Sequence, residues 1–280
     1  MTDLQSSACE KFRQLHATGC FVLPNPWDKG TAIYLEQLGF KALATSSAGY
    51  AFSRGKPDGG VGRDEMLMHI GEVVSATPLP VNADFLNGFA DEPEEVANNV
   101  RRCITTGVAG LSIEDSTGRN DVPLYEEGLA VERIGAARAA IDASGSRVLL
   151  TGRCEAFLVD QSEPLRTVLA RLPAYGEAGA DCLYAPGLSK PEEIAAVVRA
   201  AGSKPVNVLV AGFNSELSLA LLADLGVRRI SVGAGLALAA WGAFIEAAHE
   251  IATKASFNNL ARAARSAELN GLFGRQGKEE

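Results

Sequence analysis

Hydrophobic and polar positions follow a regular order along this chain, in which a short apolar run precedes a longer segment with helical spacing. The apolar runs begin at Cys20, Lys41, Leu79, Ala109, Arg147, Asp181, Pro205 and Arg229. Between them apolar residues recur every three or four positions, which is the period of an amphipathic helix. Eight strand–helix units in 280 residues predict an α/β protein with one (β/α)8 (TIM) barrel.

Local signals place the helices of this barrel. The spacing predicts helices over 3–17, 29–38, 63–76, 92–106, 131–143, 163–178, 191–201 and 215–225. Several begin with a capping Asp or Ser followed by proline or acids, and several end at glycine, as Ser189 and Gly202 do for one of them. An open doubly wound sheet would need a G-x-G-x-x-G dinucleotide motif after its first strand, and no strand runs into one.

Two segments do not fit the simple alternation. Residues 48–62 are rich in glycine and carry Arg54, Lys56 and Asp58, and a loop of this length inside a compact domain predicts an active-site lid. The barrel is expected to occupy residues 1–255. Residues 256–280 then form a C-terminal helical tail, with an amphipathic helix at 257–265, that packs on a neighbouring subunit or covers the bottom of the barrel.

Composition narrows the classes of function. The chain has 26 Lys and Arg against 34 Asp and Glu, a formal net charge of −8, so no basic face is available for nucleic acid or an anionic membrane. An odd number of cysteines without a CxxC pair favours free thiols in the cytoplasm over a disulfide framework. Only three histidines are present and none is paired with cysteines at the spacing of a zinc site, which argues against zinc.

Charged residues stand where three of the predicted strands end. Asp84 ends one strand, Glu114 the next and Arg153 the one after. Because ligands collect at the carboxyl edge of parallel strands, we expect these groups to meet there. Asp84 and Glu114 suit a hard cation, Mg²⁺ or Mn²⁺, and Arg153 suits a substrate carboxylate. The alternative is that each acid caps a helix or pairs with an arginine.

Five more residues are candidates for contact with a small anionic substrate. Asn82 lies two residues before Asp84, so both side chains point to the same side of their strand. Ser46 and Ser47 offer hydroxyls and backbone amides to an oxyanion, although a plain serine turn explains them equally well. Asp58 on the predicted lid is a candidate general acid or base. Trp27 walls the pocket or fills the core.

These residues together resemble the isocitrate lyase/phosphoenolpyruvate mutase superfamily. The resemblance covers about residues 8–255. It rests on Asn25-Pro-Trp-Asp28, Ala42-Leu-Ala-Thr-Ser-Ser47, Lys56-Pro-Asp-Gly-Gly60, Val81-Asn-Ala-Asp84, Ser112-Ile-Glu-Asp115 and Gly152-Arg-Cys-Glu-Ala-Phe157. It implies a Mg²⁺-dependent barrel enzyme that binds 2-oxo or 2-hydroxy acids through an enolate-like intermediate. It also implies a homodimer or homotetramer whose last helix is exchanged between subunits.

For this chain the resemblance implies metal contacts from Asp84 and Glu114, and substrate contacts from Ser46, Ser47 and Arg153, with Asp58 on a gating loop. Two departures stand out. Asn82 replaces an acid of the superfamily's Asp-x-Asp. The loop at 116–123 lacks the cysteine and histidine of the isocitrate and methylisocitrate lyases, so neither activity is expected.

Three functions remain open from the sequence. The first is cleavage of a C–C bond in an oxaloacetate-like 2-oxo or 2-hydroxy dicarboxylate. The second is P–C chemistry on phosphonopyruvate or phosphoenolpyruvate, for which Arg119 and Asn120 would stand in place of a lysine and an asparagine of the mutase branch. The third is a catalytically weak homologue that binds 2-oxo acids.

Overall fold

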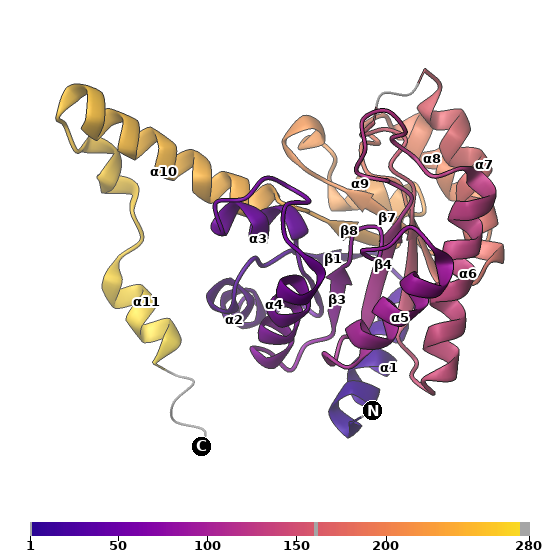
Figure 1. The fold of residues 1–280 in the computed structure, drawn as a ribbon. Helices are drawn as coiled ribbons and strands as arrows, with labels where there is room; N and C mark the ends of the chain where they lie inside the picture. The colour runs from indigo at the N-terminus through magenta and orange to yellow at the C-terminus, as the bar shows by residue number, and fades with distance from the viewer. Residues whose placement is uncertain (1, 160–161, 275–280) are drawn as a thin grey trace.

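Eight parallel strands form a nearly closed barrel in the computed structural model, which describes residues 2–159 and 162–274 (Figure 1). They are β1 (Phe21–Leu23), β2 (Leu43–Ala44), β3 (Val81–Asp84), β4 (Gly110–Glu114), β5 (Leu149–Arg153), β6 (Cys182–Tyr184), β7 (Val206–Leu209) and β8 (Arg229–Ser231). The hydrogen-bonded order is β1-β8-β7-β6-β5-β4-β3-β2. Between β1 and β2 the Ala44 amide donates to the Pro24 carbonyl at 3.0 Å. The predicted TIM barrel is confirmed.

Helices surround the barrel between the strands. They are α1 (Asp3–Ala17), α2 (Lys29–Gln37), α3 (Ser47–Ser53), α4 (Arg63–Ser75), α5 (Pro93–Ile104), α6 (Glu127–Ala143), α7 (Pro164–Glu177), α8 (Pro191–Ala200) and α9 (Leu219–Asp224). The predicted spans agree with these to within two residues, with two exceptions. Helix α6 begins four residues earlier, because the Glu126 carboxylate accepts from the Gly128 and Leu129 amides and caps it, and α9 begins four residues later, where the Ser218 hydroxyl accepts from the Leu221 amide. Within the described ranges, none of the helices is long and apolar enough to cross a membrane.

Helix α1 closes the end of the barrel where the strands begin. Phe12 is fully buried there and packs edge-on against Phe21 of β1. The Gln5 amide donates to the carbonyls of Ile104 and Val108, which lie just before β4. The bottom of the barrel is therefore covered by the N-terminal helix, whereas the described part of the C-terminal tail contacts α2 through Leu272.

The segment predicted as one long loop contains a helix. The Ser46 hydroxyl accepts from the Gly49 amide at 3.1 Å and caps α3, so that 48–53 is helical and only 54–62 lacks regular structure. Propensity alone does not favour a helix rich in Ser and Gly, and the cap and the burial of Ala51 against the core override it. The prediction of a fully irregular lid is thus wrong in its first half.

The last helices leave the barrel. Helix α10 (Gly235–Lys254) extends away from it and α11 (Ser266–Phe273) runs back along the outside (Figure 1). The amphipathic helix predicted at 257–265 is wrong. Instead a 3-10 turn spans Asn258–Arg262, because the Glu250 carboxylate accepts from Ser256 Oγ, Asn258 Nδ2 and the Asn259 amide and bends the chain there.

Helix α11 rests against α2, where Gln37 Nε2 donates to the Leu272 carbonyl at 3.2 Å. Residues 275–280 of the predicted tail lie outside the described residues. The division at residue 255 and the exchange of a C-terminal helix between subunits stay predictions.

Candidate active site

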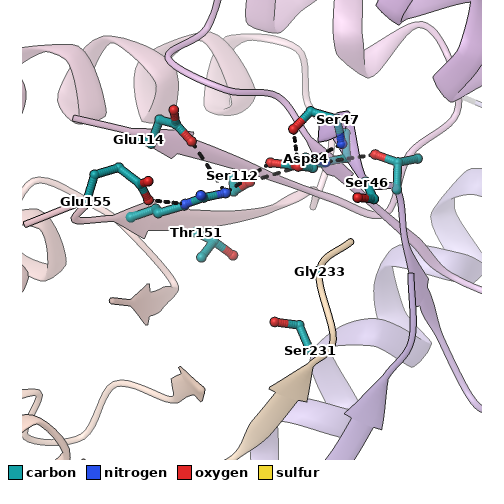
Figure 2. A network of polar contacts seen from close by, with 12 residues as sticks. Ser46, Ser47, Asp84, Ser112, Glu114, Thr151, Glu155, Ser231 and Gly233 are labelled. Atoms are coloured by element: carbon teal, nitrogen blue, oxygen red, sulfur yellow. Dashed lines mark hydrogen bonds and ion pairs between the residues drawn. The ribbon is translucent and has the colours of Figure 1, made fainter. Parts of the chain in front are cut away.

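Asp84, Glu114 and Arg153 meet at the carboxyl edge of the barrel, as predicted. They end the neighbouring strands β3, β4 and β5, and Glu114 pairs in register with Arg153. The Arg153 Nη1 atom lies 3.2 Å from Asp84 Oδ1 and 3.4 Å from Glu114 Oε2, while its Nε donates to Glu155. Figure 2 shows the three acids Asp84, Glu114 and Glu155 and the contacts that join them. One guanidinium is therefore shared by three carboxylates, which we call the acid–arginine cluster.

Burial and mutual repulsion set the charges of this cluster. Burial raises the pKa of Glu114 well above its usual range, against the opposing charge of Arg153, and the nearby Glu155 and Asp84 raise it further. Burial also raises the pKa of Glu155. For Arg153 burial works to lower the pKa, but Glu155 and Glu114 outweigh it and raise the pKa well above its usual value. The Arg153 guanidinium therefore stays charged, and three carboxyl groups surround this single positive charge.

Asp84 is held in place by residues of the segment that joins β2 to α3. Its Oδ2 accepts from the Ser47 amide at 2.9 Å and from the Ser47 hydroxyl at 2.7 Å. Its own amide donates to Thr45 Oγ1 at 2.9 Å. The two serines therefore lie beside the cluster as expected, but the Ser47 amide that was predicted to face an oxyanion donates to Asp84, and the Ser46 hydroxyl caps α3.

The cluster fits a hard divalent cation in chemistry and charge. Glu114 Oε2 is buried and accepts no hydrogen bond, although it forms an ion pair with Arg153, and Asn82 Oδ1 is buried without any hydrogen bond. Within the described residues no three acidic, histidine or cysteine side chains form a ready-made ligand set. Mg²⁺ needs only one or two carboxylates together with water and substrate oxygens. Because Arg153 spans the gap between Asp84 and Glu114, their sharing of one ion stays a prediction.

Asn82, Asp58 and Trp27 are the other residues predicted for the site, and they differ in whether they lie beside the cluster. Asn82 is buried beside Asp84 and lines the cavity inside the strand ends. Asp58 sits on the exposed 54–62 segment, where desolvation by surrounding atoms and then the charge of Asp84 raise its pKa. Trp27 instead lines an apolar hollow of about 290 Å³ together with Trp241 and Phe244 of α10, so the structure does not bring it to the cluster.

The sequence did not predict the role of Asp115 and its partners, which hold the cluster in place. Asp115, next to Glu114, turns away from the site and accepts from Arg171 at 2.9 Å, from the Tyr175 hydroxyl at 2.7 Å and from the Glu155 amide at 2.8 Å. It therefore positions the backbone at Glu155, the third acid of the cluster. The sequence signal was a second acid directly after a strand-end acid, which must face the opposite side of the strand.

A parallel barrel with an acid–arginine cluster at its strand ends has the arrangement of a TIM-barrel enzyme, in which the active site lies at the carboxyl ends of the strands. Residues 12–252 match the family model described as phosphoenolpyruvate phosphomutase. The chain belongs to this family, within the isocitrate lyase/phosphoenolpyruvate mutase superfamily.

Three known proteins illustrate the relationship. A crystal structure from Burkholderia cenocepacia J2315, described as a lyase/mutase, is 49% identical and covers 97% of this chain and 98% of its own, with a TM-score of 0.94. Oxaloacetate acetylhydrolase, solved with the product oxalate, is 25% identical over 98% of this chain and 96% of its own, with a TM-score of 0.85. The 2-methylisocitrate lyase of Salmonella typhimurium is 33% identical over 162 residues, which are 55% of this chain and 53% of that enzyme.

Proposed function

We propose that this protein is an enzyme that cleaves a C–C bond in a short, oxaloacetate-like 2-oxo or 2-hydroxy dicarboxylate and forms an enolate. The observation that carries the proposal is the acid–arginine cluster, in which a charged, oriented guanidinium lies at the mouth of the barrel. The similarity to oxaloacetate acetylhydrolase over almost the whole chain supports the same class of substrate.

Each part of the cluster has a role in this proposal. Arg153 binds the carboxylate of the 2-oxo acid end, and Glu155 and Glu114 hold the guanidinium in orientation. When the C–C bond breaks, its electron pair remains on one fragment as an enolate. Asp58, whose pKa is raised, protonates the enolate carbon. Mg²⁺ or Mn²⁺ at Asp84 and Glu114 would supply a Lewis acid that stabilises the developing negative charge.

The structure favours this proposal over phosphonomutase action. Arg119, the residue expected to stand in for a mutase lysine, pairs with Asp91 at 2.9 Å on the exposed side of its loop. Methylisocitrate cleavage is disfavoured because Ser116–Pro123 contains neither cysteine nor histidine. A homologue that only binds 2-oxo acids is the remaining alternative, since Asn82 reduces the charge available to a metal.

One assay separates these functions. Purified protein with Mg²⁺ or Mn²⁺ is incubated with oxaloacetate, methylisocitrate or phosphonopyruvate, and products are followed by NMR. Hydrolysis of oxaloacetate by water yields oxalate and acetate, and its decarboxylation with uptake of a proton yields pyruvate and CO₂. Either result supports the proposal. Turnover of methylisocitrate or phosphonopyruvate alone, or binding without turnover, overturns it.

The Asp84→Ala variant tests the metal assignment. We expect kcat/KM to fall at least ~100-fold, because a metal contact and the link to Ser47 are both lost. The matched control is Asp64→Ala, which removes an exposed acid paired with Arg63 and Arg102 and should leave turnover unchanged. Unchanged turnover in Asp84→Ala, with native thermal unfolding, would remove Asp84 from the metal site.

The proposal includes an assembly and a compartment. Apolar side chains of α10 are exposed, including Leu238, Phe244 and Ile245. A contiguous apolar surface of this kind marks a protein interface, and a second copy of the chain in a homodimer or homotetramer would cover it. None of the five cysteines forms a disulfide, which supports the cytoplasm as the proposed location.

A further inference from the structure

The inside of this barrel is unusually polar. TIM-barrel interiors are normally filled by layers of Val, Ile and Leu. Here a cavity of about 40 Å³ lies inside the strand ends, and ten of the side chains around it are polar: Asn25, Thr45, Asn82, Asp84, Ser112, Arg153, Tyr184, Asn207, Arg229 and Ser231. The polar residues alternate with apolar ones along β7 and β8, so they face inward together.

Arg229 is the charged group at the inner end of this cavity. It is 2% exposed, and its side chain crosses the barrel from β8 to β5. Its Nε donates to Asn207 Oδ1 at 2.9 Å, Nη2 donates to Thr151 Oγ1 at 3.1 Å, and Nη1 lies 3.3 Å from His16 Nε2. A guanidinium has five N–H donors, so two of them are left by these three contacts.

All three partners of Arg229 are uncharged. His16 Nδ1 lies 2.7 Å from the Phe12 carbonyl, which can only accept, so Nδ1 carries the proton and Nε2 accepts from Arg229. Burial and then the charge of Arg229 lower the pKa of His16 to about 3, so the ring is neutral. Across the described part of the chain, no carboxylate lies within ion-pair distance of Arg229.

A buried cation without a counter-ion is energetically expensive. Arg133 is also buried without a carboxylate, but it donates to the carbonyls of Asn87, Ala90 and Asp91 and does not line this cavity. What distinguishes Arg229 is the polar space beside it. A cavity needs ~10–15 Å³ to hold a water, so one of about 40 Å³ accommodates a few waters or one carboxylate group.

The two arginines line one cavity at different depths. Thr151, which accepts from Arg229, lies two residues before Arg153 on β5. Two residues along a strand span roughly 7 Å, so Arg229 contacts β5 one inward-facing position deeper in the barrel than Arg153, and both arginines line the same cavity. Arg153 is already compensated by three acids, whereas Arg229 has none.

We propose that Arg229 binds the second carboxylate of the substrate inside the barrel, while the first lies at Arg153. This inference rests on the proposed function for the identity of the site, and it makes Arg229 the residue that selects dicarboxylates over monocarboxylates. The unpartnered Asn82 Oδ1 in the same cavity accepts from a water or a substrate hydroxyl. The small volume disfavours a phosphonate at the inner position.

Calorimetric titration of the full-length protein with unreactive acids tests this proposal. The probes are malonate and succinate as dicarboxylates, and acetate and propionate as monocarboxylates. We expect the parent to bind a dicarboxylate at least ~10-fold more tightly, since a charge-assisted contact is worth at least one factor of ten. Arg229→Gln should abolish this preference and leave monocarboxylate affinity within about 2-fold. The matched control is Arg228→Gln, whose side chain donates to the Gly19 carbonyl instead.

Asn207→Asp is the second variant and preserves the shape of the site. It keeps the acceptor for Arg229 Nε and places a carboxylate beside the guanidinium. A binding role predicts loss of dicarboxylate affinity with unchanged or higher thermal stability, whereas a purely structural role predicts unchanged affinity. No dicarboxylate preference in the parent, or its survival in either variant, overturns the proposal. These titrations need no turnover. A failed oxaloacetate assay would therefore exclude the proposed reaction, but it would not exclude the binding of a second carboxylate by Arg229.

Discussion

Asn82 is the residue at which this chain differs from the Asp-x-Asp that the resemblance leads us to expect at the proposed metal site. Its amide lies on the same face of β3 as Asp84 and leaves Oδ1 buried and unpartnered. The acid–arginine cluster already combines three carboxylates with one guanidinium. A further negative charge there would attract a divalent cation and, without one, would add repulsion.

The Asn82→Asp variant should therefore bind Mg²⁺ about 10-fold more tightly, by roughly 1.4 kcal/mol, and unfold at a lower temperature when metal is absent. Calorimetric titration with Mg²⁺ and thermal unfolding in EDTA measure the two effects. Asn98→Asp is the control because Asn98 is exposed on α5. Equal Mg²⁺ affinity in parent and Asn82→Asp would show that position 82 does not contact the ion.

His16 makes the stability of the protein depend on pH. Its pKa is lowered to about 3 by burial and then by Arg229, while the unfolded chain binds the proton near 6.5. Between pH 6.5 and about 3 the imidazole of His16 binds a proton in the unfolded chain but stays neutral in the folded protein. The free energy of unfolding therefore decreases by up to ~1.4 kcal/mol for each unit by which the pH falls. Urea unfolding between pH 7 and pH 5 should show a shallower pH slope for His16→Gln. Identical slopes would exclude this role.

The residues of the site were predictable to different extents. Asp84, Glu114 and Arg153 follow apolar runs directly, so their meeting at one edge followed from parallel-strand topology. Arg229 stands at the start of a strand, where no ligand is expected, and only its long side chain carries it into the barrel. The alternation of polar and apolar residues in β7 and β8 was the available signal for it.

Most helices and strands were predictable from the sequence. The spacing of their apolar residues and the position of their caps agree with the faces that are buried in the barrel. Helix α3 and the turn after α10 were not, because both depend on single contacts made by Ser46 and Glu250 rather than on periodicity.

The packing of α1 beneath the strands makes a prediction for Gly110 at the start of β4. A Cβ at this position would lie 2.6 Å from Phe12 Cε1 and 2.8 Å from Asn82 Oδ1. Gly110→Ala should destabilise the protein by about 1–3 kcal/mol through overpacking. Gly135→Ala is the control: it lies within α6 with open space around it, and it should stabilise by about 0.5–1 kcal/mol. Equal unfolding midpoints for the two variants would show that α1 does not pack tightly there.

For the molecule as a whole, the sequence predicted the barrel because eight units of strand and helix leave few other arrangements. The path of the C-terminal helices could not be predicted in the same way. Helix α10 has apolar residues around much of its circumference, and what covers them is not part of the chain's own barrel. The hydrophobic pattern of one sequence does not identify the surface that packs against such a helix.

The exposed face of α10 leads to the prediction that the protein is a homo-oligomer in solution. Phe244 is 62% exposed and Ile245 58%, and burying such side chains contributes about 1.5–3 kcal/mol each. Light scattering after gel filtration should give a mass of two or four 29.3 kDa chains. Phe244→Glu should shift it toward one chain at low micromolar concentration, whereas Leu4→Glu, at an exposed position on α1, should not. A single-chain mass for the parent would show that α10 is covered in some other way.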